Sequence, residues 1–245
     1  MKNTKQYYDE FIAHFQQLGT ADYSIAEIKK ETLEQQAVGS NTCIAIYDFI
    51  KDEYEILHWI FDTKDSDRPR TMSRQAMAAL IHPSDIDYTI HCKMRTLGVL
   101  ETLPPEELGD YKIAYECRMK DHRGIYHRII HQFMVLQTNE QGKIWLFRLQ
   151  LTRMASQDNE VPPRGMIIVN TRTNKKLIWN NENCLTPREI EIAGYLAEGY
   201  DSKKIAKKLF ISKNTVDNHR RNILRKTQTP DTGLALLYAR TLGLI

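Results

Sequence analysis

The sequence predicts two domains of different fold class: an α+β domain built on an antiparallel sheet, then an all-α domain of four short helices. Three β-rich runs in the middle of the chain are joined by turns that end in glycine, which is typical of an antiparallel meander. The last quarter of the chain instead has apolar residues at helical spacing and capping residues at the helix ends. We expect N-terminal helices over 1–38, the α+β domain over 39–154, a linker with a β-hairpin over 155–183, and the helical domain over 184–245.

Composition is consistent with this division. A chain of 245 residues can form two domains with cores, and its apolar content of 42% and charged content of 27% are ordinary for globular proteins. The 34 Lys and Arg residues against 31 Asp and Glu give a net charge of +3, but 184–245 holds 11 basic and 6 acidic residues. A basic tail behind a near-neutral body suggests one nucleic-acid-binding domain attached to another module.

The four cysteines are widely spaced and form no Cys-x-x-Cys pair, so neither a zinc site nor a disulfide framework is predicted. No signal peptide is recognisable, and no apolar run approaches the roughly 18 residues of a membrane span. We therefore expect a cytoplasmic protein that has reduced thiols and no membrane partner.

In the first part of the chain, apolar spacing predicts amphipathic helices over 2–18 and 24–37, which we expect to pack on the next domain or on a second copy. Strands are predicted over 42–49 and 53–60, joined at Lys51-Asp52, and over 111–119, 125–137 and 143–152. Helices are predicted over 73–81 and from Ser84 or Asp85 to about 97, with one turn at 106–108. A hairpin over 166–169 and 177–179 is too short to be stable alone, so we expect it to pack on a neighbour.

The order of elements over 41–154 resembles a PAS domain. The residues that carry the resemblance are His82-Pro83-Ser84-Asp85, Tyr115-Glu116-Cys117-Arg118, Asp121 to Gly124 with Tyr126, and Gly142. PAS domains sense small ligands or cofactors, or mediate dimerisation. The helical part has no Asn-Cys-Arg-Phe-like flavin motif, so a photoreceptor is not expected, and the cofactor, if any, stays open.

If the predicted register is right, one face of the sheet lines a ligand pocket; the alternative is a fully packed core. His127 and His131 share that face and form either a metal-ligand pair or two ordinary polar residues; the second is favoured because no third ligand has suitable spacing, so no metal is predicted. The candidate pocket residues are Tyr115, Cys117, His127, His131 and Phe147.

The helical domain shows its helix boundaries in its sequence. Thr186 and Glu189 have capping-box spacing around Pro187, and Gly199 follows the first helix. Ser202 and Ser212 are predicted to cap the second and third helices. Phe210 and Ile211 are expected to fill the turn between them, and Val216 and Ile223 to face inward; the arrangement is a helix-turn-helix.

Between Lys203 and Lys226 there are nine Lys or Arg residues and one acid, Asp217. A helix with an apolar base and a cationic outer face suits the groove of a polyanion. The alternative is a solvated helical bundle with a basic surface.

Residues 185–245 closely resemble the DNA-binding domain of LuxR/NarL-type transcription regulators. The resemblance rests on Leu185-Thr186-Pro187-Arg188-Glu189, Ala197-Glu198-Gly199, Ile205-Ala206, Leu209-Phe210-Ile211-Ser212, Thr215-Val216, Asn218-His219 and Asn222-Ile223-Leu224-Arg225-Lys226. It implies DNA binding and a dimer role for the last helix, over 234–242. The segment 227–233 departs from the usual Leu-Gly-Val-like stretch and Arg-Thr pair, so we expect the entry to that helix to be built differently.

Asp217, Asn218 and Arg221 are rotated away from the inward-facing Val216 and Ile223, and the resemblance implies the same three positions as base readers. Phosphate contacts are predicted for Lys204, Lys213, Asn214, Thr215, His219, Arg220 and Arg225.

These observations favour a sequence-specific transcriptional regulator that binds double-stranded DNA as a homodimer, under control of a PAS-like domain that senses a ligand or mediates dimerisation. RNA polymerase is a further candidate partner. The alternative is an adaptor whose helical tail binds a partner protein. An enzyme is not predicted, because the chain has neither a nucleophile elbow nor a Gly-rich phosphate loop.

Overall fold

The computed structural model describes residues 42–61, 69–154, 165–179 and 185–245, together with Gln6, Asp9, Ile12, Ala13, Tyr23 and Leu33. The helices predicted over 2–18 and 24–37 therefore lie almost wholly outside the described residues. Most of the charged loop after residue 61 and of the linker after residue 154 also lies outside them.

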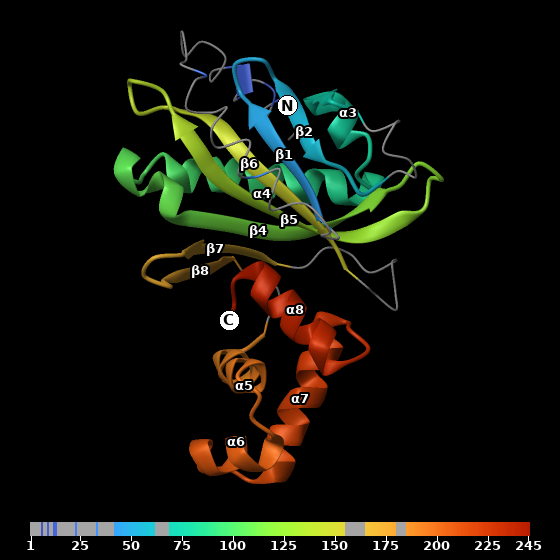
Figure 1. Cartoon of the computed structure of the whole chain (residues 1–245), viewed down its shortest axis with the longest axis vertical. Helices are drawn as coiled ribbons and strands as arrows, with labels where there is room; N and C mark the ends of the chain where they lie inside the picture. Colours follow the sequence, from blue (N-terminus) through green and yellow to red (C-terminus); the bar gives the residue numbers. More distant parts are fainter. Residues whose placement is uncertain are drawn as a thin grey trace.

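An antiparallel sheet of eight strands dominates the described part of the chain, in the order β3-β2-β1-β6-β5-β4-β7-β8 (Figure 1). The predicted α+β class and all five predicted strands of the first domain are confirmed. The strands are β1 (Thr42–Asp48), β2 (Glu53–His58), β3 (Thr71–Ser73), β4 (Tyr111–Lys120), β5 (Tyr126–Thr138), β6 (Ile144–Arg153), β7 (Met166–Asn170) and β8 (Lys176–Trp179).

The hairpin of β7 and β8 extends this sheet, because β7 pairs with β4 from Tyr111↔Asn170 to Tyr115↔Met166. The hairpin was predicted, and pairing with a larger sheet supplies the stability that two strands alone lack. This pairing is long-range, because Tyr115 of β4 and its partner Met166 of β7 are 51 positions apart in the sequence.

One face of the sheet is covered by short helices, and the main apolar core lies between the sheet and these helices. Ser73 begins the first of these, since its hydroxyl accepts a 3.1 Å hydrogen bond from the N–H of Ala76. Buried Asp85 accepts 2.9 Å hydrogen bonds from both the main-chain N–H and Nε of Arg118, which fixes the start of the long helix against β4. These helices are α3 (Arg74–Ala78), the 3-10 turns η2 (Pro83–Asp85) and η3 (Pro105–Asp110), and α4 (Ile86–Leu100).

The opposite face of the sheet is shared by two apolar clusters. One lies over β1 and β6, around the fully buried Trp145. The other joins Ala114, Ile130 and Ile167 of the sheet to the C-terminal helices. The C-terminal helices thus dock on the face opposite α4 (Figure 1).

The C-terminal part contains the four predicted helices: α5 (Pro187–Ala197), α6 (Ser202–Leu209), α7 (Lys213–Thr227) and α8 (Thr232–Leu242). The capping box of Thr186 and Glu189 and the positive φ of Gly199 are as predicted. Two details were wrong. Asp201, and not Ser202, caps α6, accepting a 2.8 Å hydrogen bond from the N–H of Lys204.

Across the part of the chain that the structure describes, no helix is both long and apolar enough to cross a bilayer.

The second wrong detail concerns the turn between α6 and α7. Phe210 is 95% exposed and adopts a left-handed conformation with φ of 54°, so it points into solvent and does not fill the turn. Ile211 alone packs against the core, as a half-buried residue. Apolar character suggested an inward side chain, but the left-handed cap at this residue turns Phe210 outward.

Candidate DNA-binding surface and sensor cavity

Helix α7 is held by an apolar base. Val216 and Ile223 are buried against α5 and α6, and Ser212 caps the helix by accepting a 3.0 Å hydrogen bond from the N–H of Thr215. Helix α6 and the N-terminal end of α7 lie farthest from the sheet (Figure 1). The N-terminal half of α7 is therefore accessible to a large partner.

The capping box also ties α5 to α7. The Glu189 carboxylate accepts from the N–H of Thr186 and lies 2.7 Å from Nζ of Lys226. Burial alone would raise the pKa of Glu189, but the hydrogen bonds from Lys226 and Thr186 outweigh it, and the pKa is lowered. Lys226 is half-buried in this contact.

The three predicted base readers lie together on the outer side of α7. Asn218 and Arg221 are exposed, and a guanidinium nitrogen of Arg221 donates to the side-chain oxygen of Asn218. Asp217 is half-buried and pairs with Lys213 at 2.7 Å, one turn earlier. This hydrogen-bonded pair with Lys213 lowers the pKa of the Asp217 carboxyl, which is ionised at neutral pH.

The predicted phosphate contacts divide into two groups. Lys204, Lys213, Asn214 and Arg225 are exposed, whereas Thr215 and His219 are half-buried. Arg220 is turned inward, where its guanidinium donates to Ser202 Oγ at 2.9 Å and to Thr232 Oγ1 at 3.3 Å. It therefore links α6, α7 and α8 in the described arrangement, whereas the sequence suggested a phosphate contact for it.

The predicted ligand-pocket residues are mostly packed core. Tyr115, Cys117 and His131 are buried on the sheet face that α4 covers, and the rings of Tyr115 and His131 stack at 5.2 Å. His131 Nε2 lies 3.1 Å from Cys117 Sγ. Burial lowers the pKa of His131 to about 3, with a smaller contribution from the charge of Lys93.

His127 lies near the start of β5, where its Nε2 is 2.9 Å from Asp121 Oδ2 in the β4–β5 turn. The structure therefore separates the two histidines that share a strand face. Among the described residues there is no group of three His, Cys, Asp or Glu side chains that could hold a metal ion.

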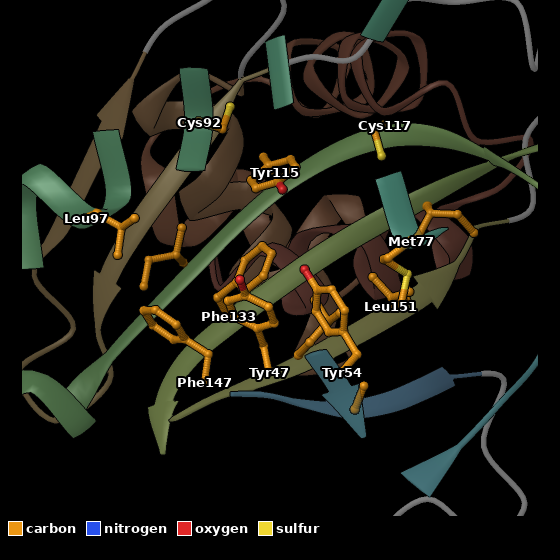
Figure 2. Close-up of a cluster of buried hydrophobic side chains, with 14 of the residues drawn as sticks. Tyr47, Tyr54, Met77, Cys92, Leu97, Tyr115, Cys117, Phe133, Phe147 and Leu151 are labelled. Carbon is orange, nitrogen blue, oxygen red and sulfur yellow. The ribbon is translucent and has the colours of Figure 1, made fainter. Parts of the chain in front are cut away.

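Two cavities lie on the α4 side of the sheet. The larger has a volume of about 320 Å³ and lies between α3 and α4. The smaller, of about 30 Å³, is lined mainly by aromatic residues of the sheet, and Figure 2 shows Tyr47, Phe133 and Phe147 gathered there. Of the predicted pocket residues, only Phe147 lines either cavity.

Lys93 lines both cavities and was missed in the sequence. It lies three residues after Ile90 and four before Leu97, both buried, so it occupies the centre of the apolar face of α4. A lysine inside an apolar helical stripe is the sequence signal that would have found it.

Comparison with known proteins identifies the C-terminal part. The model of the family described as bacterial regulatory proteins, luxR family, matches residues 183–238. The C-terminal helices form a luxR-family regulatory domain. The helix-turn-helix geometry of α6 and α7 agrees with this assignment.

Curated relatives match over part of the chain. The quorum-sensing regulator RhlR of Pseudomonas aeruginosa is 44% identical over 69 residues, covering 28% of this chain and 29% of RhlR. The regulatory protein SdiA of Escherichia coli is 29% identical over 124 residues, covering 48% of this chain and 52% of SdiA. The matches thus span about half or less of these relatives. The family and both relatives are described as regulatory proteins.

Solved structures were also compared with the whole chain. A phage VqmA–DPO complex covers 89% of each chain at 14% identity with a TM-score of 0.33. SdiA of Escherichia coli covers 99% of each chain at 17% identity with a TM-score of 0.29.

Proposed function

We propose that this protein is a sequence-specific DNA-binding transcriptional regulator, in which a PAS-like domain over 39–154 controls the luxR-family domain over 184–245. The observation that carries the proposal is the outer side of α7, where exposed cations surround Asn218 and Arg221 on a helix with an apolar base. Such a helix fits the major groove, where bidentate side chains distinguish base pairs. Its place of action is then the cytoplasm, where the DNA lies.

In this proposal Asp217, Asn218 and Arg221 contact base edges. Arg221 is suited to guanine O6 and N7, and Asn218 to adenine N6 and N7. Lys204, Lys213, Asn214 and Arg225 contact phosphates, which position α7 without reading sequence. Thr215 and His219 contribute from the edges of the surface, whereas Arg220 supports α7 from within.

A homodimer on DNA is part of the proposal, because one recognition helix alone has little affinity and a two-fold dimer contacts two half-sites. Helix α8 is the candidate interface. Leu237 is 46% exposed and Leu234 is half-buried, whereas Leu242 is buried and unavailable in this arrangement. RNA polymerase is a candidate partner of the DNA-bound form.

The experiment is selection of bound sequences from random duplex DNA, followed by affinity measurements on the selected site at several salt concentrations. A regulator gives one enriched motif with two half-sites, bound by two chains, and an affinity that falls steeply with salt because phosphate contacts release counterions. No enriched motif and a salt-independent affinity would favour the adaptor that binds a partner protein through its helical tail. A single half-site occupied by one chain would overturn the homodimer.

A further inference from the structure

His131 has a buried ring whose polar atoms the packing of the sheet does not explain. Its Nε2 lies 3.1 Å from Cys117 Sγ and 3.0 Å from Met119 Sδ. Its Nδ1 has no hydrogen-bond partner among the residues that the structure describes, although the residue is only 2% exposed. A polar ring kept in an apolar core without full hydrogen bonding is costly, which indicates a role beyond packing.

Neither tautomer of the neutral imidazole suits these surroundings. If Nε2 carries the hydrogen, one N–H faces two sulfurs, and Nδ1 is a buried acceptor without a donor. If Nδ1 carries it, this N–H has no acceptor, and the Nε2 lone pair faces Met119 Sδ, which has no hydrogen to donate. Three lone-pair donors therefore meet at one place, as ligands do around a cation.

The sheet itself brings the three side chains together. Cys117 and Met119 alternate along β4 and therefore share a face. His131 on β5 pairs with Tyr115, two residues before Cys117, so it lies diagonally across from Cys117. Among the described residues, His, Cys, Asp and Glu alone supply no metal site, because the third donor here is a thioether.

The donor set and its burial select the kind of ion. Thiolate and thioether ligands favour copper(I), and imidazole also suits copper, whereas magnesium and calcium take oxygen ligands. Burial raises the pKa of the Cys117 thiol well above its ordinary value and lowers the pKa of His131 to about 3, so both groups are neutral without an ion. A monovalent ion that displaces the thiol proton to solvent forms a neutral pair with the thiolate. A divalent ion would leave a net charge in the core.

The three donors need only a small adjustment to hold an ion. Bonds of about 2.3 Å to sulfur and about 2.0 Å to nitrogen, at a tetrahedral angle, separate the two ligand atoms by roughly 3.5 Å. The contacts of 3.0 and 3.1 Å must then open by about half an ångström, which the flexible side chain of Met119 allows. The larger cavity reaches Ile81, whose main chain pairs with Met119, and so provides an approach to the cluster.

We propose that Cys117, Met119 and His131 form a binding site for one copper(I) ion in the core between the sheet and α4. The inference goes beyond the proposed DNA-binding function and does not depend on it. Binding releases the thiol proton of Cys117 and gives the thiolate, the thioether and the imidazole a common partner.

The test titrates the full-length, reduced protein with copper(I) under anaerobic conditions, in competition with the chelator bicinchoninate. We expect one ion per chain, and X-ray absorption at the copper edge should report two sulfur ligands and one nitrogen ligand. Cys117→Ser, Met119→Leu and His131→Leu should each lower the affinity by at least about tenfold, since even residues that only orient metal ligands have effects of that size. Zinc(II), the second probe, should not displace copper(I).

Cys43→Ser and Met77→Leu are the matched controls, because Cys43 and Met77 are buried in the same apolar core. Both variants should retain the copper(I) affinity of the wild type. Absence of binding in competition with the chelator, equal losses of affinity in Cys117→Ser and Cys43→Ser, or displacement of copper(I) by zinc(II) would each overturn the proposal.

Thermal unfolding of the metal-free variants shows whether each one folds. Met119→Leu conserves the volume of the side chain, so it keeps the proposal testable even if Cys117→Ser does not fold. Copper(I) should raise the Tm of the wild-type protein, because it binds the folded state, and should raise the Tm of Met119→Leu less. An equal rise in the two proteins would place the ion elsewhere and overturn the proposal.

Discussion

Arg128 on β5 donates a 2.7 Å hydrogen bond to the main-chain carbonyl of Thr227, the last residue of α7. The same guanidinium donates from Nε to Glu116 at 2.8 Å and lies 4.9 Å from the ring centre of Tyr238 on α8. A cation at the C-terminal end of a helix interacts favourably with its exposed carbonyls and dipole. Arg128 therefore joins the sheet directly to the C-terminal end of α7.

Arg128→Met should destabilise the protein by about 3–5 kcal/mol, because buried Glu116 then loses its ion pair with Arg128. Urea unfolding measures this change. The double variant Glu116→Gln with Arg128→Met should recover much of the loss, since it removes the stranded charge. Arg172→Met removes an exposed ion pair with Asp110 and should change stability by only about 0–1 kcal/mol. Equal effects of Arg128→Met and Arg172→Met would contradict the buried role of Arg128.

Arg221→Ala should cost about 1–3 kcal/mol of affinity on the selected DNA site and relax preference at one base pair, because a bidentate contact is lost. Lys213→Ala should weaken binding to all sequences alike and reduce the salt slope by about 1. Anisotropy titrations on the selected site and on single-base variants measure both effects. If Lys213→Ala changed the preferred motif and Arg221→Ala did not, the assignment of readers and anchors would be reversed.

Because the pKa of His131 is lowered in the folded protein, we expect the free energy of unfolding to depend on pH. Its folded pKa is about 3, and its ordinary value is about 6.5. As pH falls below about 6.5, the unfolded chain takes up a proton that the folded protein does not bind until about pH 3. The contribution of neutral His131 to the free energy of unfolding is thus fully present above pH 6.5. Below this pH it decreases by up to about 1.4 kcal/mol per pH unit.

His131→Leu removes the titrating group, so its unfolding free energy should vary less between pH 6.5 and 5 than that of the wild type. Chemical unfolding at several pH values measures the difference between the two curves. Parallel curves over this window would mean that His131 is protonated in the folded protein.

Phe210→Gly should stabilise the luxR-family domain by roughly 0.5–1 kcal/mol. Phe210 adopts a left-handed conformation that costs little for glycine, and it is 95% exposed, so little packing is lost. Thermal unfolding measures the gain. Phe210→Leu keeps the backbone penalty and should give no comparable gain; a gain as large as that of glycine would attribute the effect to the exposed ring.

Local sequence signals were sufficient to predict the ends of most helices and the strands of the meander. Thr186 with Glu189 satisfies the first N–H groups of α5, and Gly124 and Gly142 adopt the positive φ that the tight turns of β4–β5 and β5–β6 require. These preferences act within a few residues, so they are visible in a single sequence. The cationic outer face of α7 follows in the same way from helical spacing.

Only the tertiary structure decided which parts of the chain come together. The pairing of β7 with β4, the contact of Arg128 with Thr227 and the place of Lys93 between two cavities each join residues distant in sequence. The sequence of α7 alone does not show that the Arg220 guanidinium donates hydrogen bonds to Ser202 and Thr232. Packing between distant elements determines these contacts, because the direction of a side chain has meaning only relative to the neighbour that covers it.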